Sequence, residues 1–365
     1  MDGRINRPDS LTFTTPPLTS LASPSRFMTR RLLAFLLVGG SLAAAEPQRF
    51  DLAKRASEID SRAKEHPEIK FTFTDDKGKP ADLQHAVVDT RVPAQGKLVI
   101  WLMGHNQGLF ERISSYGYHG IQPHYSNGWF AGVTKAQYEG GDGTVLGKIR
   151  LEAASGEDFS PLVDIPKLDG MMERALQLVK WLAKENPEGK WEQFLNENGS
   201  GLRWEKVILS GISHGSTTAA RFAMHQKVDR VVMFSGPRDN TETWQGGVSA
   251  TPSNRFFGFT HVLDGGWVAN HYCRSWQLLR MHNHGPIMNV DDARPPYGNS
   301  RRLITNMDVK NNSGRAHTIV VPGGKDTMGQ WVYDEVFRYL FTHPVDQSGP
   351  AVPMDAGCAM DQGPK

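Results

Sequence analysis

The chain has 365 residues, with 41 Lys and Arg against 39 Asp and Glu, and 39% of its residues are hydrophobic. The first 45 residues hold five of the basic and two of the acidic residues, which leaves 36 basic against 37 acidic residues in the remainder. This balance predicts no basic face and argues against a nucleic-acid partner. No internal repeat or low-complexity linker interrupts residues 50–340, so a single large α/β domain is favoured over two smaller ones.

The N-terminal segment has the features of an export signal. A pair of arginines follows Met28 and leads into a short apolar run over residues 32–42. Ala43 and Ala45 then provide the small residues of a cleavage site. We expect residues 1–45 to be an upstream segment plus signal peptide, with Met28 as an alternative start and cleavage after Ala45. The protein is then secreted or periplasmic, without stable membrane insertion. A retained membrane anchor is the alternative, although the apolar run is short for a bilayer.

Beyond the signal, the hydrophobic patterning predicts alternating strands and helices. The run at 97–103 is continuously apolar, which is typical of a strand covered on both faces. The segment 168–184 carries its apolar residues at three- and four-residue steps, which predicts an amphipathic helix. Strands are predicted over 69–74, 85–89, 97–103, 119–124, 230–234, 256–264 and 302–308 and from 207, and helices over 51–66, 168–184, 217–224, 269–281 and 330–341.

One stretch carries the strongest chemical signal: Gly211-Ile-Ser213-His-Gly215, between the predicted strand from 207 and the small-residue helix at 217–224. A serine at the tip of a sharp strand-to-helix turn needs a strained backbone, and flanking glycines leave room for that turn. The turn exposes the Ser213 hydroxyl and sets the amide of His214 beside it, at the positive end of a helix. An ordinary glycine-rich turn is the alternative interpretation.

A second loop has the character needed to stabilise an oxyanion. The strand at 97–103 enters Gly104-His105-Asn106-Gln107 directly. Acyl transfer to a serine needs two amide donors, one from the residue after the nucleophile and one from a loop after an earlier strand. We therefore predict an oxyanion hole formed by His214 with Gly104, His105 and Asn106, although a plain strand-to-helix turn would have a similar sequence.

An acid and a base complete the pattern. Asp264 ends a predicted strand, and His317 lies in the loop predicted after the last strand. A histidine base is needed to take the serine proton, and a carboxylate to orient the imidazole. The order Ser213, Asp264, His317 is the order Ser, acid, His of one fold class of serine hydrolases. Alternatives stay open for both positions: Asp239, Asp291 or Asp292 as the acid, and His261 or His271 as the base.

The remaining candidates are less specific. Tyr118 and Trp129 are predicted to bind substrate, although core packing is the more frequent fate of such residues. Cys273 and Cys358 either pair in a disulfide or remain two free thiols. The spacings His282-x-His284 and His271-x-Cys273 lack an organised third and fourth ligand. No phosphate loop and no dinucleotide fingerprint occurs, so we expect no metal and no cofactor.

With these residues in place, the chain resembles the α/β-hydrolase superfamily over residues 85–341. The resemblance rests on the Gly104 loop, Ser213, Asp264, His317 and the predicted closing helix. The segment from Trp191 to Trp204 is also similar to a poorly characterised exported branch of that superfamily. The resemblance implies a mostly parallel sheet of about eight strands with helices on both faces, and hydrolysis of ester, thioester or amide bonds without a cofactor.

This chain departs from the common pattern at three places. His214 replaces the residue types often found after the nucleophile, Ile212 precedes the serine, and the oxyanion loop lacks a His-Gly-Gly-Gly form. These departures leave the substrate class open.

The sequence thus predicts one α/β-hydrolase domain over residues 46–343, followed by a flexible tail over 344–365. Its function is predicted to be that of an exported serine hydrolase acting on a small-molecule or polymeric carboxylic ester through a Ser-His-Asp triad and an acyl-enzyme. A non-catalytic binding protein that keeps the fold is one alternative, and a peptidase or polymer depolymerase with the same triad is another. The oligomeric state stays open.

Overall fold

The structure is a computed structural model that describes residues 46–354, apart from 68–69, 126–127, 129–132, 134–136, 138–141, 240–242 and 322–324. By its contacts the chain divides into residues 1–44 and 45–365. All described residues belong to the second unit.

Among the described residues, nine strands form a single central sheet in the order β1-β2-β4-β3-β5-β6-β7-β9-β8. The two pairs β1–β2 and β2–β4 are antiparallel, and every other neighbouring pair is parallel. The mostly parallel sheet predicted from the sequence is therefore confirmed, with nine strands rather than eight. The strands are β1 (Arg49–Arg55), β2 (Leu83–Asp89), β3 (Leu98–Trp101), β4 (His119–Gln122), β5 (Val207–Ile212), β6 (Arg230–Phe234), β7 (Phe256–His261), β8 (Ile287–Asn289) and β9 (Arg302–Thr305).

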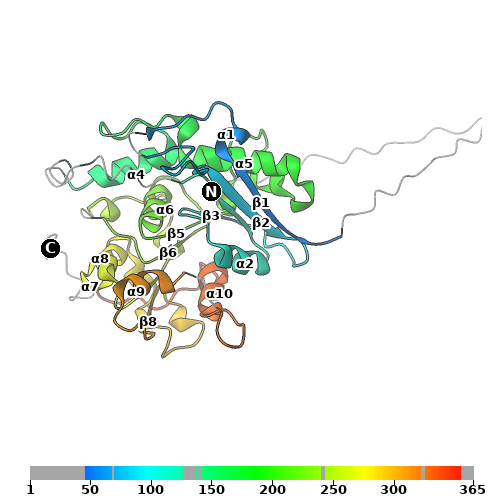
Figure 1. Cartoon of the computed structure of the whole chain (residues 1–365). Helices are drawn as coiled ribbons and strands as arrows, with labels where there is room; N and C mark the ends of the chain where they lie inside the picture. Colours follow the sequence, from blue (N-terminus) through cyan, green and yellow to red (C-terminus); the bar gives the residue numbers. More distant parts are fainter. Residues whose placement is uncertain are drawn as a thin grey trace, which may run out of the picture. The chain divides into compact units, whose positions relative to one another are not determined.

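Helices cover both faces of this sheet (Figure 1). The first face carries α4 (Val145–Ser155), α5 (Met171–Glu185), α6 (His214–His225) and α8 (His271–Leu278). The opposite face carries α2 (Gln107–Ser115) and α10 (Asp334–Thr342). The other α-helices among the described residues are α1 (Ala56–Ile59), α7 (Gly265–Val268) and α9 (Ser313–Ile319).

The two-residue repeat of a strand explains why both faces are apolar. Along β3, Leu98 and Ile100 pack into the cluster beneath α5 and α6, whereas Val99 and Trp101 pack into the cluster beneath α2 and α10. All residues of β3, β5 and β6 are buried. A strand with helices on both sides has no face toward water, which is why these segments are mostly apolar and do not alternate; the polar residues among them are Ser210 and Arg230.

The predictions for the N-terminal part of the domain are wrong in two places. Residues 51–66, predicted as a helix, instead contain most of β1 and only the four residues of α1. The predicted edge strand at 69–74 has only isolated bridges, at Phe71 and Thr74. Because β1 is an edge strand with one antiparallel partner, Phe50 and Leu52 are only partly buried, and its polar residues hide the strand pattern.

The segment after α10 is held against the domain over its described part. Arg301 is fully buried and donates from Nη2 to the carbonyls of Val345 and Gln347, at 3.0 and 2.9 Å. The amides of Gly349 and Val352 donate to the carbonyls of Asn299 and His282. Residues 344–354 thus differ from the flexible tail predicted for 344–365, because backbone carbonyls of this segment satisfy a buried guanidinium.

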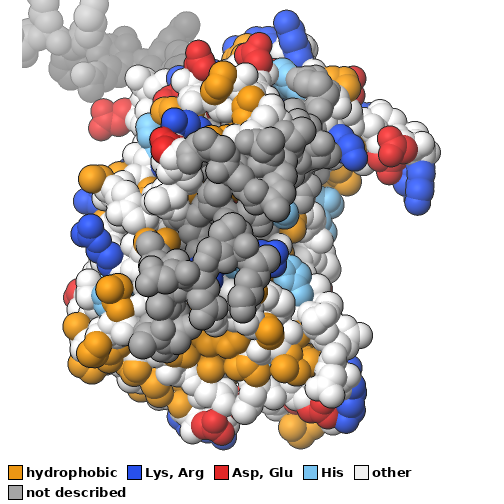
Figure 2. Space-filling model, turned by 90° about the vertical axis from the view of Figure 1, so that its left-hand side faces the viewer, with side chains coloured by type: hydrophobic (Ala, Val, Ile, Leu, Met, Phe, Trp, Pro, Cys, Tyr) orange, Lys and Arg blue, Asp and Glu red, His pale blue; other side chains and the backbone are white. Residues whose placement is uncertain are grey.

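The surface carries both signs of charge. On the face shown in Figure 2, basic and acidic side chains are interspersed around the described surface. Within the described residues, no helix combines the length and the apolar character needed to cross a membrane.

Candidate active site

The turn after β5 holds Ser213 in an unusual backbone conformation. Its φ of 56° and ψ of −120° lie outside the regions that non-glycine residues normally occupy. The Ser213 amide donates to the carbonyl of Phe234 at 3.0 Å, and its carbonyl accepts from the hydroxyls of Ser216 and Thr217 at 2.7 and 3.0 Å. The surrounding chain therefore fixes a strained serine at the start of α6, as predicted for a nucleophile turn.

The two glycines of the motif are required by close contacts between backbones. A Cβ atom on Gly215 would lie 1.5 Å from the Leu102 carbonyl oxygen, and one on Gly211 would lie 2.4 Å from the Gly215 carbonyl carbon. The Leu102 amide also donates to the Ser210 carbonyl at 2.8 Å. The end of β3 is consequently pressed against the nucleophile turn, with no space for a side chain between them.

Asp264 and His317, 53 residues apart in the sequence, are joined by a hydrogen bond. The His317 Nδ1 lies 2.7 Å from the Asp264 Oδ2. The other carboxylate oxygen accepts from the Gly266 amide at 2.8 Å and from the Tyr272 hydroxyl at 2.9 Å. Asp264 is 2% exposed. A buried carboxylate with donors on both oxygens fixes the orientation of the imidazole ring.

The main chains of Ser213 and His317 are hydrogen-bonded to two consecutive residues, Phe234 at the end of β6 and Ser235 just after it. Phe234 accepts the Ser213 amide, and the next residue, Ser235, donates its hydroxyl to the His317 carbonyl at 2.7 Å. His317 lies on α9, although the sequence predicts a loop there. Within the described residues, no hydrogen bond joins the Ser213 Oγ to the His317 ring. In enzymes without substrate, such catalytic hydrogen bonds are often long and tighten only when substrate binds.

The electrostatic setting of the pair keeps the acid ionised. Burial by itself would raise the pKa of Asp264, but hydrogen bonds from His317, the Gly266 amide and Tyr272 outweigh it and lower the pKa. Burial, together with the neighbouring Asp264 charge, raises the pKa of Tyr272, so its hydroxyl stays protonated and donates. Asp264 is thus an acceptor-only carboxylate over the neutral pH range.

The loop predicted to supply the second oxyanion donor lies beside the nucleophile turn, because Leu102 contacts it directly. Gly104 accepts a hydrogen bond from the Trp101 indole at 2.9 Å, and His105 stacks on His85 with ring centroids 3.9 Å apart. The Asn106 side chain caps α2 by accepting the Leu109 amide at 2.8 Å. This bond occupies the side-chain oxygen of Asn106, which is the acceptor of that side chain.

A buried cluster that the sequence analysis missed lies behind His214. Arg150, on α4, is fully buried and forms an ion pair with Asp239, which follows β6. Its guanidinium also lies 3.2 Å from the His214 Nδ1 and donates to the His214 carbonyl at 3.2 Å. No local motif in the sequence marks Arg150. A signal was present only in Asp239, a carboxylate at a strand end near the turn.

The other candidate acids and bases are engaged elsewhere. Asp239 pairs with Arg150 rather than with His317, and Asp291 accepts from the Thr305 hydroxyl and the Asn306 amide at 2.6 and 2.7 Å. Asp292 accepts from Asn289 at 2.6 Å. His261 is fully buried with its Nε2 2.7 Å from the Met307 carbonyl, and the His271 Nδ1 lies 2.9 Å from Arg274.

The residues predicted to bind substrate are Tyr118 and Trp129. Tyr118 is 5% exposed and donates its hydroxyl to the Phe341 carbonyl at 2.9 Å. That prediction is wrong, because Tyr118 packs in the core between β4 and α10. Trp129 lies outside the described residues. Cys273 is disulfide-bonded, and no free cysteine occurs among the described residues; Cys358 lies outside them.

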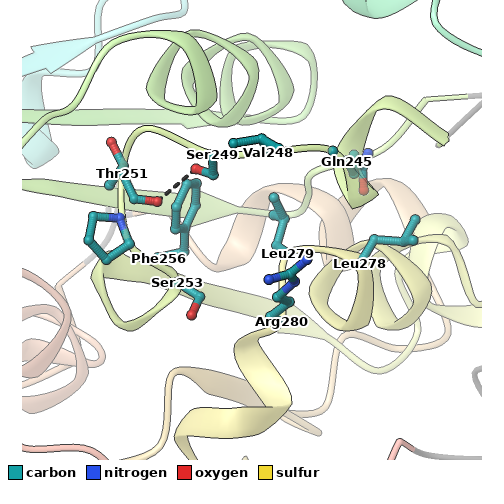
Figure 3. Close-up of a pocket in the computed structure, with 11 residues that line it drawn as sticks. Gln245, Val248, Ser249, Thr251, Ser253, Phe256, Leu278, Leu279 and Arg280 are labelled. Atoms are coloured by element: carbon teal, nitrogen blue, oxygen red, sulfur yellow. Dashed lines mark hydrogen bonds between the residues drawn. The ribbon is translucent and has the colours of Figure 1, made fainter.

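A cavity of about 320 Å³ lies at the amino-terminal end of β7 (Figure 3). It includes Phe256, the first residue of β7, and Val248 and Leu279. Asp264 follows the opposite end of the same strand, and the first and last of its six residues are about 17 Å apart at about 3.3 Å per residue. This cavity is therefore separate from the pair formed by Asp264 and His317.

The topology and these contacts together define the class of fold. Ser213 follows β5, Asp264 follows β7 and His317 follows β9, and the carboxyl ends of these parallel strands meet at one edge of the sheet. A strained Gly-x-Ser-x-Gly turn at that edge, followed by an acid and a histidine in this order, is the arrangement of the α/β-hydrolase fold. The chain has this fold.

No protein-family model and no curated protein matches the sequence. Among solved structures, the chain is similar to esterase B from Lactobacillus rhamnosis, with 11% identity over 74% of this chain and 79% of that chain and a TM-score of 0.34. It is also similar to a Klebsiella pneumoniae protein assigned as a dienelactone hydrolase, with 12% identity over 71% and 86% of the two chains and a TM-score of 0.32. A lidless serine hydrolase of Xanthomonas campestris matches with 11% identity over 51% and 69% and a TM-score of 0.27.

Proposed function

We propose that this protein is an exported serine hydrolase that cleaves carboxylic esters through an acyl-enzyme. The observation that carries the proposal is the 2.7 Å contact between the His317 Nδ1 and the buried Asp264 carboxylate, at the sheet edge where Ser213 is held in a strained turn. A serine hydroxyl is a weak nucleophile unless a base takes its proton, and an imidazole oriented by a carboxylate is suited to that task.

The proposed reaction has two halves. The Ser213 Oγ attacks the ester carbonyl while His317 takes the hydroxyl proton, and the electron pair of the carbonyl moves to its oxygen. The proton then passes from His317 to the leaving alcohol as the bond between carbonyl carbon and alcohol oxygen breaks. A water molecule releases the acyl group in the same way, with His317 again as base and then acid. Asp264 stabilises the imidazolium that forms in each half.

Two backbone segments are proposed to hold the oxyanion. We assign this role to the amide of His214, at the N-terminus of α6, and to an amide of the loop formed by Gly104, His105 and Asn106. The close contact between Leu102 and Gly215 supports the assignment, because it sets the loop next to the turn. Donors fixed before reaction stabilise the developing charge without reorganisation.

Export is the second part of the proposal, and it rests on the sequence of residues 28–45. The chain secreted by an expression host is expected to begin at Glu46. Intact-mass measurement of the secreted protein tests this, and retention of the apolar run in the mature chain would support a membrane anchor instead.

The decisive test replaces the nucleophile. Ser213→Ala is expected to lower kcat for aryl esters by about 10⁴-fold or more, because the acyl-enzyme no longer forms. A fluorophosphonate probe is expected to label Ser213 in the parent protein, mapped by mass spectrometry of the modified peptide. Ser200→Ala, at an exposed serine, is the matched control and should keep both activity and labelling.

Each alternative has its own outcome. A folded parent protein that neither reacts with the probe nor hydrolyses esters would be a binding protein with an α/β-hydrolase fold. A parent protein that is labelled at Ser213 but cleaves only peptides would be a peptidase. Unchanged ester hydrolysis by Ser213→Ala would reject the assignment of the nucleophile.

A further inference from the structure

The buried cluster behind the nucleophile turn has no place in the proposed chemistry so far. Arg150 comes from α4 and is held by Asp239: its Nε donates to Oδ2 at 2.9 Å and its Nη2 donates to Oδ1 at 2.5 Å. The Trp244 indole adds a donor to Oδ2 at 3.0 Å. Both charged groups are at least 97% buried. Removing a charge pair from water is costly, so a pair this deep needs tight geometry to be tolerated.

The guanidinium also forms hydrogen bonds with two residues in the N-terminal part of α6. Its Nη1 donates to the His214 carbonyl and to the Thr218 hydroxyl, each at 3.2 Å. Its Nη2 lies 3.2 Å from the His214 Nδ1. His214 is therefore held by its main chain and by its ring at once, from a helix that is 64 residues distant in the sequence.

The contact with the ring fixes a tautomer. A guanidinium has only donors, so the His214 Nδ1 must be the acceptor and the ring proton must reside on Nε2. A planar guanidinium with several parallel donors can meet a carboxylate, a carbonyl and a ring nitrogen together. A lysine, with one compact ammonium group, cannot.

We propose that Arg150, backed by Asp239, is a positioning residue for the nucleophile turn: it fixes the backbone of His214, the assigned oxyanion donor, and holds the His214 ring as its Nε2–H tautomer. This inference rests on the proposed function for its catalytic consequence, whereas the contacts themselves do not depend on it. Arg150 acts through His214 and does not touch the reacting atoms.

The contacts between Arg150 and His214 have a second consequence, which concerns the charge of the His214 ring. Burial, followed by the positive charges of Arg150, Arg238 and His317, lowers the pKa of His214 to about 4. His214 is then uncharged when His317 becomes an imidazolium during reaction. The positive charge of Arg150 is balanced by Asp239, so this ion pair adds little net charge beside the developing imidazolium.

The test compares two variants with the parent. In Arg150→Met combined with Asp239→Leu, both charges are lost together, so that no buried charge is left alone. In Arg150→Lys, the positive charge stays but the contacts with His214 are lost. Each variant is expected to lower kcat for an aryl ester about 10–100-fold with KM nearly unchanged, because the oxyanion donor is misplaced while the binding surface is kept.

The ring nitrogens of His214 provide a readout that a merely structural ion pair would not move. Nitrogen-15 spectra of histidine-labelled parent protein should show His214 as the Nε2–H tautomer near neutral pH. The double variant should show a mixture of tautomers and a pKa closer to the ordinary value of 6.5. A His214→Gln sample identifies the signal.

The chain offers a matched control. Arg174 and Asp169 form another buried pair, 3.2 Å apart, and Arg174 likewise contacts a histidine, His124, but none of these residues contacts the nucleophile turn. Arg174→Met with Asp169→Leu should alter stability to a similar degree and leave kcat within about twofold.

The outcomes separate the two proposals. A double variant at Arg150 and Asp239 that is folded, with an unchanged His214 tautomer and kcat within about twofold of the parent, overturns the positioning role. An equal loss of kcat in the control pair also overturns it, since the effect would then be general destabilisation. A parent protein without esterase activity overturns the proposed function, and the ring-nitrogen spectra still decide whether Arg150 sets the tautomer.

Discussion

At the scale of single residues, strain is concentrated at Ser213. Its φ of 56° and ψ of −120° would cost about 1–3 kcal/mol in an unconstrained chain. Three donors on its carbonyl and the bond from its amide to Phe234 hold this conformation in the folded state. This conformation places Ser213 just after the carboxyl end of β5, at the edge of the sheet where Asp264 follows β7.

The contact between Gly215 and Leu102 gives a residue-scale prediction. Gly215→Ala is expected to destabilise the protein by about 1–3 kcal/mol and to reduce activity, because the new Cβ would lie 1.5 Å from a carbonyl oxygen. Urea unfolding measures the first effect and aryl-ester turnover the second.

Gly265→Ala is the control for that change. Its Cβ would have no heavy atom within 4 Å and its φ is not positive, so stability should change by less than about 0.5 kcal/mol. Equal stability of the Gly215→Ala protein and the parent would mean that β3 and the turn separate more easily than the structure indicates.

At the scale of elements, α5 shows how a helix contributes by packing rather than by chemistry. Its apolar stripe includes Ala175, Val179 and Leu182, all fully buried against the first face of the sheet. The stripe was predictable because the apolar residues recur at three- and four-residue steps. The helix contributes no residue to the candidate triad, so its substitutions separate stability from activity.

Leu182→Ala is therefore expected to lower the free energy of unfolding by about 2–5 kcal/mol through the loss of buried methyl groups and the cavity left behind. The protein that remains folded should keep the parent kcat. Urea unfolding and ester turnover on the same sample check both statements.

Lys184→Ala on the same helix is the matched control, since its side chain is 83% exposed and its ion pair with Glu185 is at the surface. Its effect on stability should stay within about 0.5 kcal/mol. A Leu182→Ala protein as stable as this control would show that α5 is not part of the cooperative core.

At the scale of the whole molecule, buried and partly buried histidines connect stability to pH. Burial is the main cause that lowers the pKa of His85, His214 and His284 to about 4 and that of His124 to about 3, from an ordinary value of 6.5. Between about pH 4 and pH 6.5 the unfolded chain therefore binds more protons than the folded chain. Asp264, whose pKa is lowered from 3.8, adds to this loss only at still lower pH.

The free energy of unfolding should thus be highest above about pH 6.5 and fall as the pH drops toward 4. The slope is at most about 1.4 kcal/mol per pH unit for each excess proton bound by the unfolded chain. Urea unfolding at several pH values across this window measures it.

His284→Gln should make that slope shallower, because one titrating group is removed while the hydrogen bond to Ser253 can be kept by the amide. Stability that is constant from neutral pH to about pH 4.5 would contradict the burial of these histidines in the folded protein.

The sequence by itself determined the central strands and the nucleophile turn. The segments around β3, β5 and β6 are mostly apolar because helices cover both of their faces, and Gly211, Ser213 and Gly215 form one local motif. Local patterns of this kind depend only on residues that are close in the sequence, so they can be recognised without a structure. The positions of Ser213, Asp264 and His317 after three predicted strands could also be recognised in the sequence. Because parallel strands end at one edge of the sheet, these positions predict that the three residues lie at the same edge.

Tertiary structure decided the rest. Only the pairing of β1 with β2 turns residues 49–55 into an edge strand, because the partner supplies the hydrogen bonds that the local sequence does not require. Only the fold selects Asp264 over Asp239 as the partner of His317, since the two carboxylates look alike in sequence and differ in what lies beside them. Arg150 reaches His214 across 64 residues, and no pattern within either segment encodes a contact between them.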